Sequence, residues 1–122
     1  MLDLIIKNGS CYIDKDLKNH DIAIKDGKII EIGKIDNEAK EIFDAKGLIV
    51  LPGCIDTQTH FREPGSTDTE DLNSGSRAAI VGGITAVFEM PNTNPPTSTK
   101  KEFQRKLDLA KNRMYCNYAF YF

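Results

Sequence analysis

The sequence predicts an α/β protein in which an N-terminal β-sandwich segment, residues 1–52, precedes the first units of a β/α barrel, residues 53–122. As far as Leu51, short alternating apolar runs are separated by turns, which is typical of antiparallel β structure. After Gly53, apolar runs of strand length alternate with helical patterns in the order β-α-β-α-β, and this order requires a parallel sheet. Because a complete β/α barrel has about 250 residues, we expect an incomplete barrel and a chain that is the beginning of a longer protein.

The composition is that of a folded globular domain, with 40% hydrophobic and 28% charged residues. The net charge of -2 provides no basic field for nucleic acid or an anionic membrane, so neither is an expected partner. No apolar stretch approaches the ~20 residues of a membrane helix. The three cysteines are widely spaced and odd in number, which favours a reducing cytoplasmic location over a disulfide framework.

In the N-terminal segment, the most distinct local pattern is a β-hairpin over residues 21–32. Isoleucines alternate with other residues on both sides of Asp26-Gly27, a dipeptide typical of two-residue hairpin turns. Ala45-Lys46-Gly47 then predicts a turn into a further strand over residues 48–52, which Pro52-Gly53 ends. We expect the strands of this half to form part of an antiparallel sandwich.

In the barrel segment, strands are expected at residues 54–61, 84–90 and 116–122. Capping-box patterns predict helices that begin after Thr67-x-x-Glu70 and after Thr99-x-x-Glu102, and Gly82-Gly83 should end the first near Ile80. Residues 100–113 contain six basic and two acidic side chains. Because apolar side chains share one face of this helix, a solvated amphipathic helix is favoured over an anion-binding patch; these are Phe103, Leu107, Ala110 and Met114.

The first group of candidate functional residues lies on the strand over residues 54–61. Side chains two residues apart share a face of a strand, so Asp56, Gln58 and His60 should project together, with Arg62 just beyond the strand. Ligands of parallel β/α proteins bind at this C-terminal edge of the sheet. Taken singly, His60 is more often a hydrogen-bonded structural histidine and Arg62 a surface salt-bridge residue, and it is their neighbours that favour a functional site.

A second polar group follows the next strand, in the sequence EMPNTNPP. It should lie at the same edge of the sheet, so that Asn92 and Arg62 could face one ligand. The alternative is an ordinary turn, since Pro, Asn and Thr are common turn residues. The polar members of the group are Glu89, Asn92, Thr93 and Asn94.

Two motif blocks closely resemble the cyclic amidohydrolases, and dihydroorotases in particular. These blocks are LPGCIDTQTHFREPG at 51–65 and SRAAIVGGITAVFEMPNTNPP at 76–96. The opening DIAIKDGKIIEIG followed by FDAKGLIVLPG also resembles the β segment that precedes the barrel in that family. The Arg-Glu-Pro-Gly and Pro-Asn-Thr sequences favour dihydroorotase over its relatives allantoinase, hydantoinase and dihydropyrimidinase.

The resemblance implies a TIM-like, metal-dependent hydrolase that holds one or two zinc ions. Such an enzyme reversibly cyclises N-carbamoyl-L-aspartate to dihydroorotate in pyrimidine biosynthesis, and a metal suits this reaction because it activates water and polarises the ring carbonyl. His60 matches the second histidine of the family's His-x-His metal motif. Arg62 and Asn92 match the residues that bind the substrate carboxylate, and the fork of donors of a guanidinium fits such a group.

One position departs from the family pattern. Gln58 stands where the family usually has the first histidine ligand, and an amide oxygen is a poor zinc ligand. Asp56 is expected to support a ligand by a hydrogen bond rather than to bind metal itself. Since the remaining ligands and the catalytic aspartate of the family come from later strands, we expect no catalytic residue within residues 1–122 and no activity from them alone.

A different class of function is a catalytically silent, dihydroorotase-like scaffold subunit, which the glutamine at position 58 suggests. By the same resemblance, the protein is expected to form a homo-oligomer or to associate with aspartate carbamoyltransferase. Hydantoinase, dihydropyrimidinase and allantoinase remain alternatives for the enzymatic activity.

Overall fold

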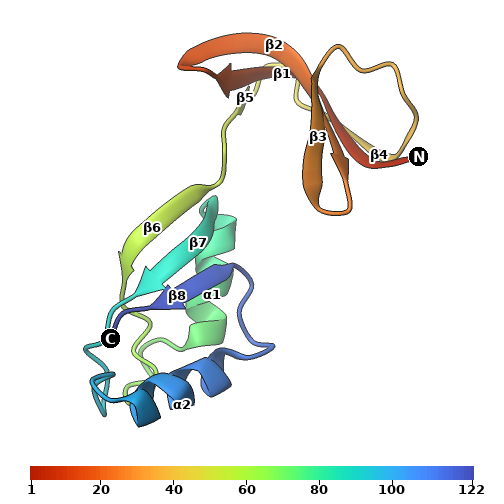
Figure 1. The fold of residues 1–122 in the computed structure, drawn as a ribbon. Helices are drawn as coiled ribbons and strands as arrows, with labels where there is room; N and C mark the ends of the chain where they lie inside the picture. Colours follow the sequence, from red (N-terminus) through yellow and green to blue (C-terminus); the bar gives the residue numbers. More distant parts are fainter. The chain divides into compact units, whose positions relative to one another are not determined.

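The computed structural model describes all residues, 1–122, as two compact units. Unit 1 is Met1–Pro52 and unit 2 is Gly53–Phe122. Figure 1 shows that unit 1 consists of strands, whereas unit 2 combines strands with both helices.

Unit 1 is a single five-stranded sheet in the order β3-β2-β1-β4, with β5 also paired to β1. The predicted hairpin is confirmed, since Lys25 pairs with Lys28 across a turn in which Asp26 and Gly27 have φ of 51° and 70°. Positive φ at both turn residues defines the turn type that matches the twist of paired strands. The strands are β1 (Leu2–Ile13), β2 (Asp16–Lys25), β3 (Lys28–Gly33), β4 (Ala39–Asp44) and β5 (Ile49–Val50).

The expectation of antiparallel pairing throughout unit 1 is wrong, because β4 and β5 both run parallel to β1. For β5, the reason lies in the turn at residues 45–48, which follows β4. Ala45 N donates to Lys7 O at 2.8 Å and Leu48 N donates to Ala45 O at 2.9 Å, so the turn interrupts the chain without reversing it. The chain therefore continues along the same edge of β1, and the strand expected over residues 48–52 shortens to Ile49–Val50.

Unit 2 confirms the β-α-β-α-β order, with three parallel strands in the sequence β6-β7-β8. Helices α1 and α2 connect these strands (Figure 1). They contain 10 and 11 residues, and neither is long and apolar enough to cross a membrane. The elements are β6 (Cys54–Thr59), α1 (Leu72–Val81), β7 (Ile84–Glu89), α2 (Lys100–Ala110) and β8 (Asn117–Phe120).

The start of α1 differs from the expected capping box at Thr67-x-x-Glu70. Residues 66–70 form turns instead, in which Thr69 N donates to Ser66 O at 3.0 Å. The capping box is made by Asp71 and Ser74, each of which accepts a backbone hydrogen bond from the other through its side chain. Both candidate starts have side chains that can cap a helix, so a contact from outside the helix selects the later one. This contact is the hydrogen bond from Leu72 N to the carboxylate of Glu63. The helix ends at Gly82-Gly83 as expected.

The start of α2 agrees with the sequence, because the Thr99 hydroxyl accepts the Glu102 N–H at 3.2 Å. The helix ends at Ala110, so Met114 lies beyond it, although it still packs against the core. The expectation of a fully solvated basic face is wrong at Lys106, whose side chain has 0% exposure. It shares the helix face that carries Phe103 and Ala110, since residues three and four apart are neighbours on a helix.

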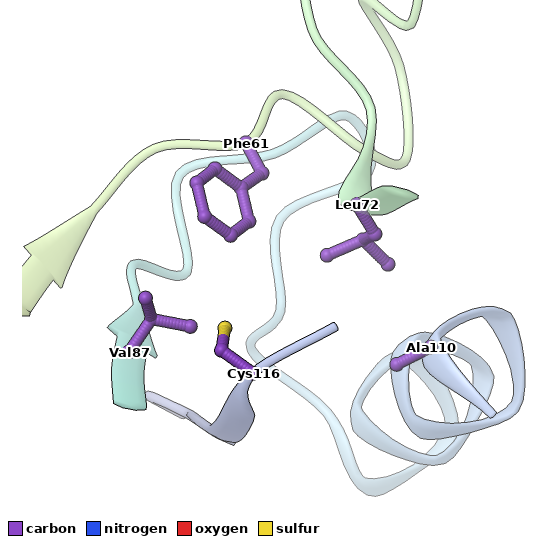
Figure 2. Close-up of a cluster of buried hydrophobic side chains, with 5 residues drawn as sticks. All are labelled: Phe61, Leu72, Val87, Ala110 and Cys116. Carbon is purple, nitrogen blue, oxygen red and sulfur yellow. The ribbon is translucent and has the colours of Figure 1, made fainter. Parts of the chain in front are cut away.

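The core of unit 2 is a cluster of five buried side chains contributed by both helices and the sheet (Figure 2). Val87 of β7 packs with Leu72 of α1 and Ala110 of α2, so both helices cover the same face of the sheet. Phe61, from the segment after β6, also lies in this cluster. The core therefore fixes the backbone between His60 and Arg62, which are the next residues on either side of Phe61.

Replacing Gly75 with alanine is expected to destabilise unit 2. A Cβ at Gly75 would lie 2.5 Å from Cδ1 of Phe61, so α1 and the ring would have to separate. Overpacking of this kind typically costs about 1–3 kcal/mol, which chemical denaturation would measure. Gly82→Ala is the matched control at the end of the same helix, where the nearest atoms are 3.5 Å away. Equal losses in the two variants would contradict the close packing of α1 on Phe61.

Candidate functional site

The candidate site lies where the chain leaves the C-terminal ends of β6 and β7. Because the two strands are parallel, the loop at residues 60–66 and the loop at residues 90–98 start from the same edge of the sheet. Met90 N donates to Thr59 O and Asn94 N donates to Pro64 O, both at 2.9 Å. The two motif loops predicted from the sequence are therefore hydrogen-bonded to each other. We call them the β6 loop and the β7 loop.

His60 and Asn92 meet where the two loops join. Nδ1 of His60 lies 2.8 Å from Oδ1 of Asn92, and both side chains are exposed. A carbonyl oxygen can only accept a hydrogen bond, so the proton of a neutral His60 is on Nδ1 and the lone pair is on Nε2. Histidines that bind a metal are usually held in this way, with the second ring nitrogen donating to an oxygen.

Asp56 and Gln58 interact with each other rather than with His60. Oδ1 of Asp56 accepts the backbone N–H of Gln58 at 2.9 Å, and the Gln58 side chain is exposed. The pairing of β6 with β7 is irregular between Asp56 and Thr59, and His60 lies beyond the last residue of the strand. The simple alternation used in the sequence argument therefore does not extend as far as His60.

The residues of this chain do not by themselves fit a metal ion. The edge offers the imidazole of His60 and the amide of Gln58, and no group of three or more His, Cys, Asp or Glu side chains is gathered anywhere in the structure. A catalytic zinc ion usually has three protein ligands. His60 could supply one of them.

Arg62 lies on the β6 loop with an exposed side chain and a φ of 54°. Ser66 N donates to Arg62 O at 2.9 Å, which closes a tight turn. Within this turn Gly65 has a φ of 125°, and a Cβ there would lie 2.8 Å from Cβ of Asn94, so only glycine lets the two loops approach so closely. The structure therefore brings together the loops of Arg62 and Asn92, while the hydrogen bond of the Asn92 side chain is to His60.

Glu63 is a structural residue of the site that the sequence argument missed. Its buried carboxylate accepts two hydrogen bonds from the guanidinium of Arg113, at 2.7 and 3.1 Å, and one from Leu72 N at 2.9 Å. The hydrogen bond with Glu63 is the main reason that the pKa of Arg113 is raised above its ordinary value. The contact with Leu72 N selects the start of α1, because it satisfies a backbone donor that the first helical turn leaves free. No sequence signal links Glu63 with a partner 50 positions away.

Arg113→Met is expected to lower the free energy of unfolding by about 2 kcal/mol, because it leaves a buried carboxylate with only the Leu72 N–H as a partner. This loss of stability is smaller than that expected for a fully buried ion pair, because 35% of the Arg113 side chain is exposed. Lys40→Met, which removes an exposed partner of Asp3, is the matched control and should cost much less. Chemical denaturation would measure both, and a loss at Arg113 no larger than that at Lys40 would contradict this role.

Glu89, one of the polar residues predicted for the second loop, is instead the last residue of β7 and is buried in an ion pair with Lys106 that the sequence argument missed. The carboxylate at the end of β7 contacts Nζ of Lys106, and their side chains are 1% and 0% exposed. Nζ also donates to Met90 O at 3.0 Å. Burial raises the pKa of Glu89 above its ordinary value, while Lys106 and the backbone N–H of Phe61 act in the opposite direction. The position of Lys106 on the apolar face of α2 was the available signal for its burial.

Comparison with known proteins places the chain in one family. The amidohydrolase family model matches residues 49–122. Allantoinase from Escherichia coli O1:K1 / APEC is 45% identical over 113 residues, which cover 92% of this chain and 25% of that protein. L-hydantoinase (dihydropyrimidinase) from Arthrobacter aurescens superposes with a TM-score of 0.90 at 35% identity, covering 99% of this chain and 28% of that one. D-hydantoinase (dihydropyrimidinase) from Thermus sp. gives a TM-score of 0.81 at 29% identity, with coverages of 97% and 27%.

The match covers nearly the whole of this chain but only part of each relative. The chain spans about a quarter of the length of the curated relatives that it matches. The solved hydantoinases match unit 1 as well as unit 2, since they cover nearly the whole chain. The family model itself covers β6, β7, β8 and both motif loops. The chain belongs to the amidohydrolase family.

Proposed function

We propose that this chain forms the first part of a hydrolase that opens cyclic amides, of the hydantoinase and allantoinase kind. The observation that carries the proposal is the hydrogen bond between His60 and Asn92 at the C-terminal edge of the parallel sheet. That edge is where β/α proteins bind their ligands. The similarity to an allantoinase and to two hydantoinases supports this substrate class over the dihydroorotase that the motifs suggested.

The residues of the chain suit binding and orientation of a ring amide. Asn92 Oδ1 fixes the imidazole of His60, so that Nε2 is free to bind a metal ion or to act on the substrate. The amide nitrogen of Asn92 and the guanidinium of Arg62 are hydrogen-bond donors for the carbonyl oxygens of a ring. Any remaining ligands and the catalytic acid or base would come from outside residues 1–122. In the complete enzyme, a bound metal would activate water and polarise the amide carbonyl.

Dihydroorotase is a second candidate, and it rests on Arg62. A ring that carries a carboxylate needs a charged partner, and Arg62 is an exposed guanidinium on the loop that touches the Asn92 loop. Hydantoin and allantoin carry no carboxylate, so their binding would use Arg62 only as a donor to a neutral oxygen. The two candidates therefore differ in how strongly they depend on this one side chain.

The proposed function is tested by ring opening in the protein expressed with whatever coding sequence follows residue 122. Hydantoin, allantoin, dihydrouracil and dihydroorotate are supplied in turn with zinc present, and the open product is measured. Turnover of hydantoin, allantoin or dihydrouracil is expected. Turnover of dihydroorotate alone would favour the second candidate. A folded, zinc-loaded protein that opens none of these rings would contradict both candidate activities. The remaining interpretation would then be a catalytically silent subunit.

Arg62→Met is expected to separate the two candidates. If Arg62 binds a carboxylate, its loss removes charge-assisted hydrogen bonds and lowers kcat/KM for dihydroorotate by about 10- to 100-fold. Neutral rings should lose less than about threefold, since a neutral acceptor makes a weaker bond. Arg77→Met is the matched control, because Arg77 lies on α1 over the ring of Tyr115 and away from both loops. An equal loss for all rings would contradict a role for Arg62 in carboxylate recognition.

A further inference from the structure

We propose that the ion pair of Glu63 and Arg113 is a positioning device for Arg62, whose side chain it holds exposed on the β6 loop. The inference rests on the proposed function for its effect on ring opening, while its effect on the loop stands independently. Glu63 is 6% exposed, and both of its carboxylate oxygens are engaged by donors of the chain, so it is not available to a ligand. The pair therefore acts through Arg62.

Arg62 has a backbone conformation that the surrounding structure has to enforce. Its φ of 54° lies in the left-handed region, which is unfavourable for a residue with a side chain. Such a conformation persists only where neighbouring contacts determine the path of the chain. The hydrogen bond from Ser66 N to Arg62 O closes the turn, but it lies within the loop and does not tie Arg62 to the rest of the fold.

The two residues next to Arg62 along the chain provide these ties. On one side, the ring of Phe61 lies in the buried core cluster with Val87 (Figure 2). On the other side, the carboxylate of Glu63 accepts hydrogen bonds from Arg113 at 2.7 and 3.1 Å. Because both neighbours are buried and held, the backbone of Arg62 is fixed between them and its side chain is left exposed.

Arg113 is itself held by both helices, which makes it a firm point of attachment. Its Nη1 donates to Leu109 O at 3.1 Å and its backbone N–H donates to Ala110 O at 3.0 Å, both in the last turn of α2. The side chain of Asn73, on α1, donates to Arg113 O at 3.0 Å. The position of the Glu63 carboxylate is thus set by α1 and α2 together.

The chemistry of the pair favours positioning over stabilisation alone. Removing two charges from water costs about as much as their attraction returns, so replacement of both partners is often nearly neutral for stability. Paired hydrogen bonds between a guanidinium and a carboxylate add a directional definition that an apolar contact lacks. The bond from Leu72 N to Glu63 serves the helix, and α1 has a further cap in Asp71 and Ser74. The two bonds from Arg113 are therefore the part of the network that ties the loop.

A double variant separates the tie to Arg113 from the cap of α1. In Glu63→Gln with Arg113→Met, the amide oxygen at position 63 can still accept the Leu72 N–H, but the two bonds from the guanidinium are lost. The matched control is Glu102→Gln with Arg105→Met, which makes the same two changes in a pair within α2. Both double variants are made in the protein expressed with whatever coding sequence follows residue 122.

Amide hydrogen exchange reports on the turn that holds Arg62. The amide measured is that of Ser66, which donates to Arg62 O, and the reference is that of Met90, which donates to Thr59 O where the loops begin. The first double variant should speed exchange at Ser66 about tenfold and leave Met90 unchanged, and the control variant should change neither. Unchanged exchange at Ser66, equal acceleration at Ser66 and Met90, or failure of the first double variant to fold would overturn the proposal.

The catalytic consequence is tested in the complete protein with each ring that it opens. Because the pair acts through Arg62, Glu63→Gln with Arg113→Met should lower kcat/KM for each ring by no more than Arg62→Met does, chiefly by raising KM, about tenfold for dihydroorotate. Arg62→Met should cost less in this background than in the unaltered protein, since a misplaced arginine has less to lose. A larger loss than that of Arg62→Met, or additive losses, would overturn the positioning role. If the complete protein opens no ring, the proposed function fails and the exchange experiment still decides the inference.

Discussion

Lys106→Met alone is expected to lower the free energy of unfolding by about 3–5 kcal/mol at neutral pH. The substitution leaves the carboxylate of Glu89, whose side chain is 1% exposed, without its cationic partner. Chemical denaturation would measure the loss. Lys101→Met is the matched control, because Lys101 is an exposed residue of the same helix. A similar stability for the two variants would show that Lys106 is not a buried partner of Glu89.

The loss at Lys106 should depend on pH, with a sign set by Glu89. Burial raises the pKa of this carboxyl group in the folded state, and removal of Lys106 takes away an opposing effect and raises it further. Between the unfolded and the folded pKa the folded protein binds more protons, so the free energy of unfolding falls as pH rises through that interval. Lys106→Met should therefore lose less stability at about pH 5 than at about pH 8. A larger loss in acid would contradict a buried, ionised Glu89.

His60→Ala is expected to reduce ring opening by the complete protein on the order of 100-fold or more. His60 is the imidazole that the chain brings to the C-terminal edge, and Asn92 leaves its Nε2 free to act there. The chain has two histidines, which provides a matched control. His20→Ala changes a residue of β2 in unit 1 and should leave kcat/KM unchanged. Equal activity of His60→Ala and the unaltered protein would show that His60 has no role in ring opening.

The features that the sequence predicted correctly are those encoded over short distances. Asp26-Gly27 predicts its hairpin because both residues tolerate positive φ, and the structure shows φ of 51° and 70° there. The apolar runs after Gly53 predict parallel strands, and parallel strands place both motif loops at one edge. The meeting of the two motif loops could therefore be anticipated, although not the particular bond between His60 and Asn92.

The features that the sequence did not predict depend on partners that are distant along the chain. Thr67-x-x-Glu70 and the sequence from Asp71 to Ser74 both suit the start of a helix, and Glu63 favours the later start by accepting the Leu72 N–H. Glu63 in turn pairs with Arg113, 50 residues away. Lys106 belongs to a helix whose many charged residues predict exposure to solvent, and only the fold brings its side chain against Glu89. In the same way, the motifs predicted a family of cyclic amide hydrolases, but shared motifs did not distinguish its members.

The two motif loops meet in a bond between His60 and Asn92 that leaves Nε2 of His60 free. Nitrogen-15 NMR of the imidazole rings tests it most directly, with His20 as the reference within the same chain. The structure predicts that neutral His60 carries its proton on Nδ1. In Asn92→Ala, the proton of His60 should no longer prefer Nδ1, while the tautomer of His20 should stay the same. A proton on Nε2 of His60, or a tautomer that does not respond to Asn92→Ala, would contradict the account.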